Sequence, residues 1–143
     1  MRHTALFDQV CKILGDFAKR HGFIISVRGD LDEPRGVTID LENDQLIISV
    51  NRERDEESIL IHCKVRPRPR AHRRTYSIGA LSAFVQGRSE PFPLRSFSDD
   101  AKDRIHYENE FLNVELLNSE KLRLWELNAS RRRWGQKPKT TKE

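Results

Sequence analysis

Histidine, cysteine and carboxylate side chains are the groups that would carry catalysis or bind a metal in this chain. The five histidines are scattered, without the i, i+4 pair of a helical zinc site and without a nearby pair of cysteines. They are His3, His21, His62, His72 and His106. This spacing predicts no metal site, and nothing in it points to a cofactor.

Nucleophilic catalysis has no support in the remaining pattern. His62 and Cys63 are neighbours in a strand pattern, so their side chains point to opposite faces and cannot serve each other as base and nucleophile. Carboxylates cluster in "GDLDEP" and "ERDEE", two connections between predicted strands, where solvated charge is the usual explanation. The glycines fall in no Walker or dinucleotide-binding pattern. We therefore predict that the protein is not an enzyme.

The stretch "KVRPRPRAHRR", residues 64–74, is the strongest nucleic-acid signal. Its arginines can neutralise phosphates, and an aromatic residue just after it can stack on a base. These candidate residues are Arg66, Arg68, Arg70, Arg73, Arg74 and Tyr76. Pro67 and Pro69 support a different interpretation, because proline has no backbone donor and cannot continue a central strand. We favour this second interpretation, a stiff connector that leaves the sheet.

The formal charge of +4 is concentrated at the C-terminus. The last 13 residues carry six basic side chains and one acidic one, which leaves 20 basic and 21 acidic side chains in residues 1–130. We expect a single domain over residues 1–134 and a disordered basic tail over residues 135–143. A nearly neutral domain differs from a uniformly basic nucleic-acid-binding domain.

Apolar periodicity predicts an N-terminal helix followed by four strands. The helix has one apolar stripe, formed by Leu6, Phe7, Val10, Ile13, Leu14 and Phe17. Gly22 is its expected stop. Alternation then predicts strands at residues 23–28, 37–41, 46–51 and 59–65, and their short connections favour an antiparallel meander. The predicted fold class is α+β, with the helix packed on the dry face of a four-stranded antiparallel sheet.

A short helix and a long C-terminal helical region are predicted after the sheet. The segment "TYSIGALSAFVQG" begins with a serine or threonine cap and ends at Gly87. After a proline-containing loop, Ser98 is the expected start of the next helix. Two continuations fit the pattern: the helix runs on to Trp134, or it breaks near "NSE" and restarts through Leu122, Trp125 and Ala129.

The wet face of the sheet carries the partner-binding candidates. In the alternation, Ile47 and Leu60 point away from the first helix. They form an apolar patch on a face that would otherwise be polar and solvated, which is more apolar surface than such a face ordinarily has. We expect this face to bind the C-terminal helix, a protein partner or a second copy of the chain. The candidate residues are Asp40, Ile47, Asn51, Leu60, His62 and Lys64.

Residues 5 to about 86 are predicted to form a helix, a four-stranded meander and a short helix, in that order. The segments that carry this pattern are "LFDQVCKILGDFAKRHGF", "VTIDLENDQLIISVNRERDE" and "TYSIGALSAFV". Further features are an "L-x-N-x-x-L" strand pair, Arg54 and Asp55 in the next turn, and Tyr76 before the short helix. In these features the chain resembles small bacterial immunity-type proteins encoded beside secreted polymorphic toxins. The resemblance implies a protein that binds and neutralises a toxin or another protein partner.

The sequence thus predicts a non-enzymatic, immunity-like binding protein. The alternative is a nucleic-acid-binding accessory protein that uses the arginine-rich connector and the basic tail. No apolar run approaches the roughly 20 residues that span a bilayer, so we expect a cytoplasmic protein without a membrane partner. Cys11 and Cys63, one in a helical and one in a strand pattern, are predicted to be buried, reduced thiols.

Overall fold

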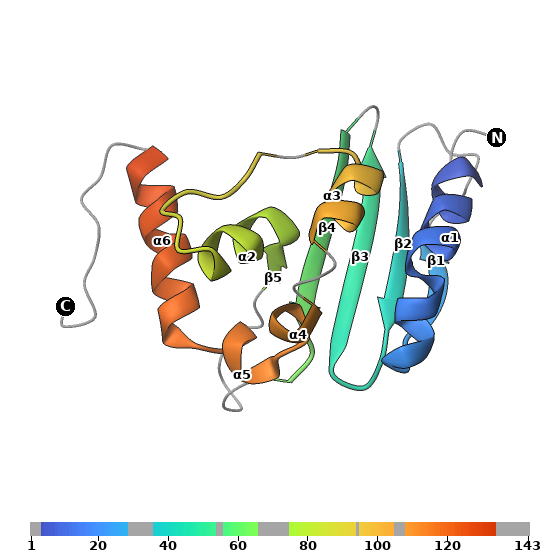
Figure 1. Ribbon diagram of the computed structural model, residues 1–143, viewed down its shortest axis with the longest axis horizontal. Helices are drawn as coiled ribbons and strands as arrows, with labels where there is room; N and C mark the ends of the chain where they lie inside the picture. Colours follow the sequence, from blue (N-terminus) through green and yellow to red (C-terminus); the bar gives the residue numbers. More distant parts are fainter. Residues whose placement is uncertain are drawn as a thin grey trace.

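The computed structural model describes residues 4–28, 36–53, 56–65, 75–93, 95–104 and 108–133, and its fold is α+β. One antiparallel sheet contains β1 (Ile24–Arg28), β2 (Val37–Glu42), β3 (Leu46–Glu53), β4 (Glu56–Cys63) and β5 (Thr75–Ser77) in sequence order. The helices are α1 (Thr4–Arg20), α2 (Ile78–Val85), α3 (Phe97–Arg104), α4 (Glu108–Phe111), α5 (Val114–Leu117) and α6 (Glu120–Arg133). Helices α1 and α3 lie over the same face of the sheet, and α6 lies at the other end of the molecule from α1 (Figure 1).

Helix α1 has the apolar stripe predicted from the sequence. Its buried apolar side chains are Leu6, Val10, Leu14, Phe17 and Ala18, while Phe7 and Ile13 are partly buried beside them. The helix ends as predicted, because Gly22 adopts a φ of +71° and the N–H of Phe23 donates to the carbonyl of Ala18 (2.8 Å). Helix α1 contacts β1, β2 and α3, and so covers the core side of the sheet at the β1 end.

The core side of the sheet is formed by alternate residues, as predicted. The buried ones are Val37, Ile39, Leu41, Leu46, Ile48, Val50, Ile59, Ile61 and Cys63, and Ile25 and Val27 of β1 are partly buried. The last predicted strand, residues 59–65, ends at Cys63, so Val65 lies beyond it and is exposed. One hydrophobic cluster contains the buried strand residues together with buried side chains of α1, α2, α3 and the segments beyond α3. The described elements therefore share a single core.

The two cysteines have different environments. Cys63 is buried, as predicted, but the prediction for Cys11 is wrong, since its side chain is exposed. Cys11 follows the buried Val10 by one residue, which turns its side chain about 100° round the helix and away from the stripe.

The sheet has five strands, which corrects the predicted four. The chain returns to the sheet after residues 66–74, and β5 pairs antiparallel with β4 through Leu60 with Ser77, Ile61 with Tyr76 and His62 with Thr75. The strand is only three residues long, too short to show an alternation. The expected end of the sheet at the proline-containing stretch is therefore wrong.

Helix α2 begins and ends at the predicted residues. The Ser77 side chain caps it by accepting the N–H of Ala80 (3.1 Å), and Gly87 follows its end with a φ of +75°. Helix α3 begins slightly earlier than predicted, because Ser96 rather than Ser98 accepts a first-turn N–H, that of Asp99 (3.2 Å).

The C-terminal half is not one long helical region in the described residues. The structure describes four helices there, α3 to α6, and of the two continuations that fit the sequence, the one with a break near "NSE" is present. Side chains at the breaks account for it: Asn113 accepts the N–H of Leu116 at the start of α5, and Ser119 accepts the N–H of Leu122 at the start of α6. Each polar side chain gives the backbone an alternative to helix continuation.

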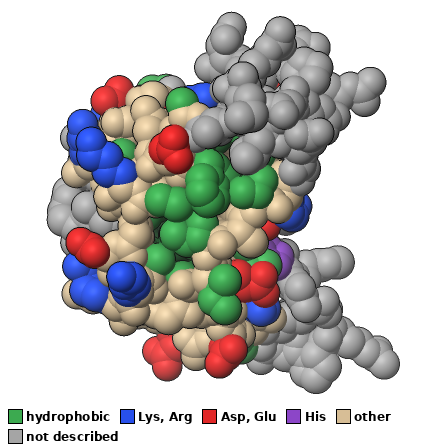
Figure 2. Space-filling model, turned by 90° about the vertical axis from the view of Figure 1, so that its right-hand side faces the viewer, with side chains coloured by type: hydrophobic (Ala, Val, Ile, Leu, Met, Phe, Trp, Pro, Cys, Tyr) green, Lys and Arg blue, Asp and Glu red, His purple; other side chains and the backbone are tan. Residues whose placement is uncertain are grey.

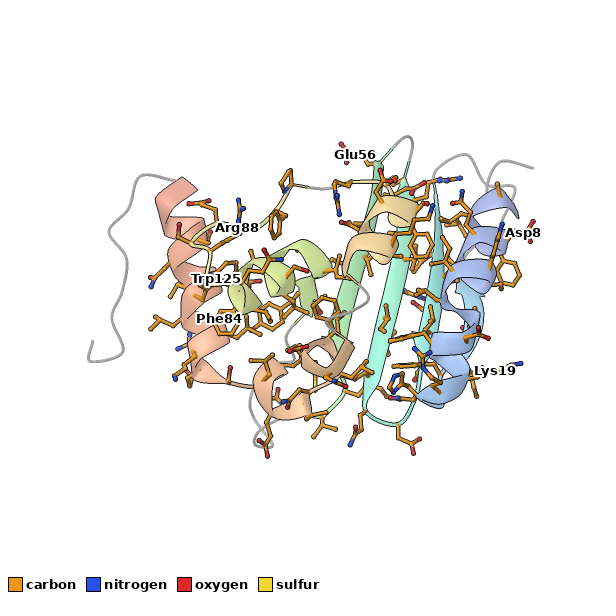
Figure 3. All side chains as sticks on the ribbon, in the orientation of Figure 1. Asp8, Lys19, Glu56, Phe84, Arg88 and Trp125 are labelled. Atoms are coloured by element: carbon orange, nitrogen blue, oxygen red, sulfur yellow. The ribbon has the colours of Figure 1, made fainter. Side chains whose placement is uncertain are left out.

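Helix α6 is attached to the rest of the protein through α2. The Trp125 indole N–H donates to the carbonyl of Arg88 (2.7 Å), and its ring meets Phe84 edge to face at 5.8 Å. The Phe84 and Trp125 side chains lie between the two helices, and Arg88 lies just beyond the end of α2 (Figure 3). No helix in the described ranges is both long and apolar enough to cross a bilayer. The predicted tail, residues 135–143, lies outside the described residues.

Candidate functional site

The open face of the sheet, opposite α1, carries three rows of side chains that cross the strands. The register places them, because residues directly opposite each other in an antiparallel pair point to the same face. In order from β1 toward β5, the first row is Arg28, Thr38, Asn51 and Ser58, the middle row is Ser26, Asp40, Ser49, Leu60 and Ser77, and the third row is Ile24, Glu42, Ile47, His62 and Thr75. Most of these side chains are hydroxyls, amides or charged groups, so this face is polar with a few apolar members.

A hollow of about 440 Å³ lies on this face. It is lined by Arg28, Asp40, Glu42, Ile47, Ser49, Asn51, Leu60, His62 and Thr75, which come from all five strands. The short side chains of the middle row account for its depth: Asp40 and Ser49 are only 7% and 9% exposed, between longer side chains on the rows to either side. We call this set of nine residues the sheet-face hollow.

Asp40 is the best-connected group of the sheet-face hollow. Its Oδ2 accepts from Nε of Arg28 (2.5 Å), and its Oδ1 accepts from Oγ of Ser49 (2.8 Å) and from Nη2 of Arg28 (3.3 Å). A buried carboxylate needs such partners, because an unpaired charge in this position would cost several kcal/mol, as a rough figure. The Asp40 carboxylate is therefore held in place with its charge balanced.

Two further groups of contacts surround this carboxylate. In the row of Arg28, the Oγ of Thr38 donates to Oδ1 of Asn51 (2.7 Å). On the other side, Nδ1 of His62 lies 2.8 Å from the Oγ of Thr75. Most polar side chains around Asp40 are thus hydrogen-bonded to each other. These bonds hold the side chains in position before anything binds to the hollow.

Ile47 and Leu60 both line the hollow, and neither faces α1. Their placement on the face away from the first helix is as predicted. No residue of α6 is among the lining residues, and α6 contacts α2 instead. The expectation that the C-terminal helix covers this face therefore finds no support in the described residues.

The structure brings together five of the six predicted partner-binding residues. Asp40, Ile47, Asn51, Leu60 and His62 line the hollow. Lys64 does not line it, but lies just beyond β4 and donates from Nζ to Oε2 of Glu42 (2.6 Å), which does.

Four lining residues were missing from the predicted set. Arg28 and Ser49 lie within the predicted strands on the face away from the first helix, and Glu42 follows the second predicted strand by one residue, so the period-two pattern was sufficient to find them. Thr75 had no such signal, because its place on this face depends on β5.

The predicted nucleic-acid set is not assembled in the described residues. The five arginines of residues 66–74 lie outside them, as do Arg54 and Asp55 of the turn on which the family resemblance partly rests. Tyr76 is described, and its side chain is 2% exposed and belongs to the core. This corrects the expectation for Tyr76, since a buried ring has no free face on which a base can stack.

No three histidine, cysteine, aspartate or glutamate side chains gather as a metal site in the part of the chain that the structure describes. The sequence matches no protein-family model, and comparisons with curated proteins and with solved structures found no significant match.

Proposed function

We propose that the protein binds another protein through the sheet-face hollow, without catalysing a reaction, in the manner of an immunity protein that neutralises a toxin or other partner. The observation that supports the proposal is the hollow itself, a preformed concavity across all five strands. Its lining combines two aliphatic side chains, Ile47 and Leu60, with the charged Arg28 and Glu42. Protein interfaces commonly combine aliphatic contacts with polar and charged side chains in this way.

The contacts within the hollow favour binding over chemistry. The hydroxyl of Ser49 already donates to Asp40, and Nδ1 of His62 is within hydrogen-bond distance of Thr75. Asp40 is paired with Arg28 and Glu42 with Lys64, so the two carboxylates are neutralised within the protein. A partner therefore meets a surface of low net charge, where shape and the two aliphatic side chains supply the affinity.

Leu60→Glu is the variant that tests this proposal. The substitution puts a charge in the lining of the hollow, and burying it under a partner would weaken binding by about thirtyfold or more, the effect of a typical hot-spot loss. The measurement is a calorimetric titration against the purified product of the gene next to the one that encodes this protein. Growth rescue on co-expression with that product gives a second readout.

Val65→Glu is the matched control. Val65 is also an aliphatic residue, 42% exposed, but it lies outside the hollow, so the same new charge should leave affinity and rescue unchanged. Thermal melting of both variants separates loss of binding from loss of folding. Equal affinity of Leu60→Glu and the unchanged protein would contradict the proposed use of the hollow.

The nucleic-acid alternative makes a separate prediction. If residues 66–74 are a connector, fluorescence anisotropy with mixed DNA and RNA at about 50 and 200 mM salt should show no salt-sensitive binding. Sub-micromolar affinity that falls steeply with salt, and disappears when Arg66, Arg68, Arg70, Arg73 and Arg74 are replaced by glutamine, would favour the alternative instead.

A further inference from the structure

Strand β1 forms an edge of the sheet, and among the described residues no further strand pairs with it. It is the first strand in the order β1 to β5 and pairs with β2. Its sequence, "IISVR", contains no proline or glycine, and its single charged residue is at its end. The opposite edge, β5, is only three residues long and continues directly into α2. Edge strands of natural proteins are normally blunted by shortness, proline, lysine or a covering element, so β1 is an exception that calls for a partner.

The direction of the backbone groups in β1 follows from the hydrogen bonds of its neighbour. The N–H of Asn43, directly after β2, donates to the carbonyl of Leu46 in β3 (3.1 Å). Bonded groups alternate sides along an antiparallel strand. Glu42, Asp40 and Thr38 therefore direct their backbone groups to the other side of β2, toward β1.

The residues opposite these three in β1 are Ile24, Ser26 and Arg28, and their backbone groups bond to β2. Ile25 and Val27 lie between them and direct their N–H and C=O groups away from the sheet. These outward groups are spaced as one side of an antiparallel ladder, with Ser26 at its centre.

We propose that two copies of the chain pair antiparallel along β1, about a two-fold axis at Ser26, to form a dimer with one continuous ten-stranded sheet. In this register Ile25 of each copy lies opposite Val27 of the other. These are hydrogen-bonded pairs, so each of the two pairs exchanges two backbone bonds. The strand is self-complementary in this register, as a two-fold interface requires.

The core-side residues of β1 support this pairing. Figure 2 looks at the end of the molecule formed by α1 and β1, and shows hydrophobic side chains gathered over a continuous area. The partly buried apolar side chains of these two elements are Phe7, Ile13, Ile25 and Val27. Pairing Ile25 with Val27 of the second copy would cover β-branched surface with β-branched surface, a favourable cross-strand combination.

The open-face residues of β1 also fit this pairing. Ile24, which is 74% exposed, lies opposite Arg28 of the second copy in this register, and Glu42 is the next residue along the same row. The aliphatic part of that arginine would cover Ile24, while its guanidinium keeps its pairing with Asp40 of its own copy. The arrangement occurs twice, once on each side of the axis. It also explains why a large aliphatic residue is exposed at Ile24.

Sedimentation of the full chain over a range of concentrations tests the dimer. We expect a mass of twice 16.8 kDa, and two variants should shift it to the monomer. Ser26→Lys places like charges opposite each other at the axis and should weaken association about fivefold or more. Val27→Pro removes an outward N–H that β2 does not use, and should weaken association at least about tenfold, since two intermolecular bonds are lost. Ser26→Thr, a conservative strand former, should remain a dimer.

Cross-linking tests the register itself, in a Cys11→Ser background because Cys11 is exposed. Under mild oxidation, Ser26→Cys should form a disulfide-linked dimer, since non-hydrogen-bonded pairs bring Cα atoms to about 4.5 Å, within disulfide range. Ile24→Cys is the matched control on the same face of the strand. Its two thiols would be four residues apart along the axis, about 13 Å, which no disulfide spans.

Three results would each overturn the proposal. The first is that the protein without substitutions stays monomeric at concentrations well above micromolar. This result is also the one expected if β1 pairs only with a strand of a different protein. Another is a dimer whose association Val27→Pro leaves unaffected. The third is Ile24→Cys cross-linking as fast as Ser26→Cys. Circular dichroism melting of each variant checks that the monomer still folds, which we expect because Ser26 is exposed and the Val27 N–H is not bonded to β2.

Discussion

Tyr76→Ala is expected to lower the free energy of unfolding by about 3–5 kcal/mol, a large part of the stability of an ordinary domain. The Tyr76 ring is 2% exposed and lies opposite Ile61 where β5 joins β4. Removing it leaves a cavity at this strand junction, directly before helix α2, and the surrounding structure can close it only in part. Denaturant unfolding followed by far-ultraviolet circular dichroism measures the change.

Tyr76→Phe is the control for this prediction. It keeps the ring and loses only the hydroxyl, so the loss should stay within about 1.5 kcal/mol. A residue that stacked on a nucleic-acid base from the surface would behave differently, because exposed substitutions usually change stability by less than about 0.5 kcal/mol. A loss of that small size for Tyr76→Ala would place the ring at the surface and restore the base-stacking hypothesis.

Glu57→Ala is expected to lower the free energy of unfolding by about 2–4 kcal/mol. The carboxylate joins two distant parts of the chain. Its Oε2 accepts from the guanidinium of Arg52, with Nε at 2.7 Å, and its Oε1 accepts the N–H of Phe97 at the start of α3 (2.6 Å). Removing it leaves a half-buried arginine without this partner and an unsatisfied donor at a helix N-terminus. Equilibrium unfolding in urea, monitored by Trp fluorescence, gives the difference.

Two further variants separate the contributions of Glu57. Glu57→Gln keeps an oxygen that can accept the Phe97 N–H but removes the charge opposite Arg52, so it should fall between the unchanged protein and Glu57→Ala. Glu120→Ala removes the acid of an exposed pair with Arg123 within α6, and should leave the unfolding midpoint unchanged. Equal losses for Glu57→Ala and Glu120→Ala would show that Glu57 is solvated rather than bridging.

The sequence predicted the two faces of β1 to β4 because alternation is a local property of extended backbone. Ile47 and Leu60 on one side, and Ile48 and Ile61 on the other, follow from counting positions within single strands. The same reasoning places Asp40 on the open face. It did not show that Asp40 would be buried there, because that burial depends on side chains from neighbouring strands, such as those of Arg28 and Ser49.

The carboxylate cluster "ERDEE" shows the limit of reasoning from local pattern. The sequence assigned its charges to a solvated turn, yet Glu57 lies within β4 and contacts Phe97, 40 residues further along the chain. Nothing near Glu57 in the sequence marks it as the member of the cluster that is half-buried. Its partner is brought to it only when α3 packs against the sheet.

What the sequence determined by itself is the set of features that depend on a few consecutive residues: the stripe of α1, the glycine stop at Gly22, the Ser77 cap and the strand alternation. Only the tertiary structure decided that β5 joins the sheet, that Tyr76 belongs to the core and that the sheet-face hollow includes Thr75. The physical reason is the range of the interactions. Helix caps and periodicity are satisfied within one or two turns of chain, whereas a three-residue strand has too little local preference and is stabilised by the strand it pairs with and the core it covers.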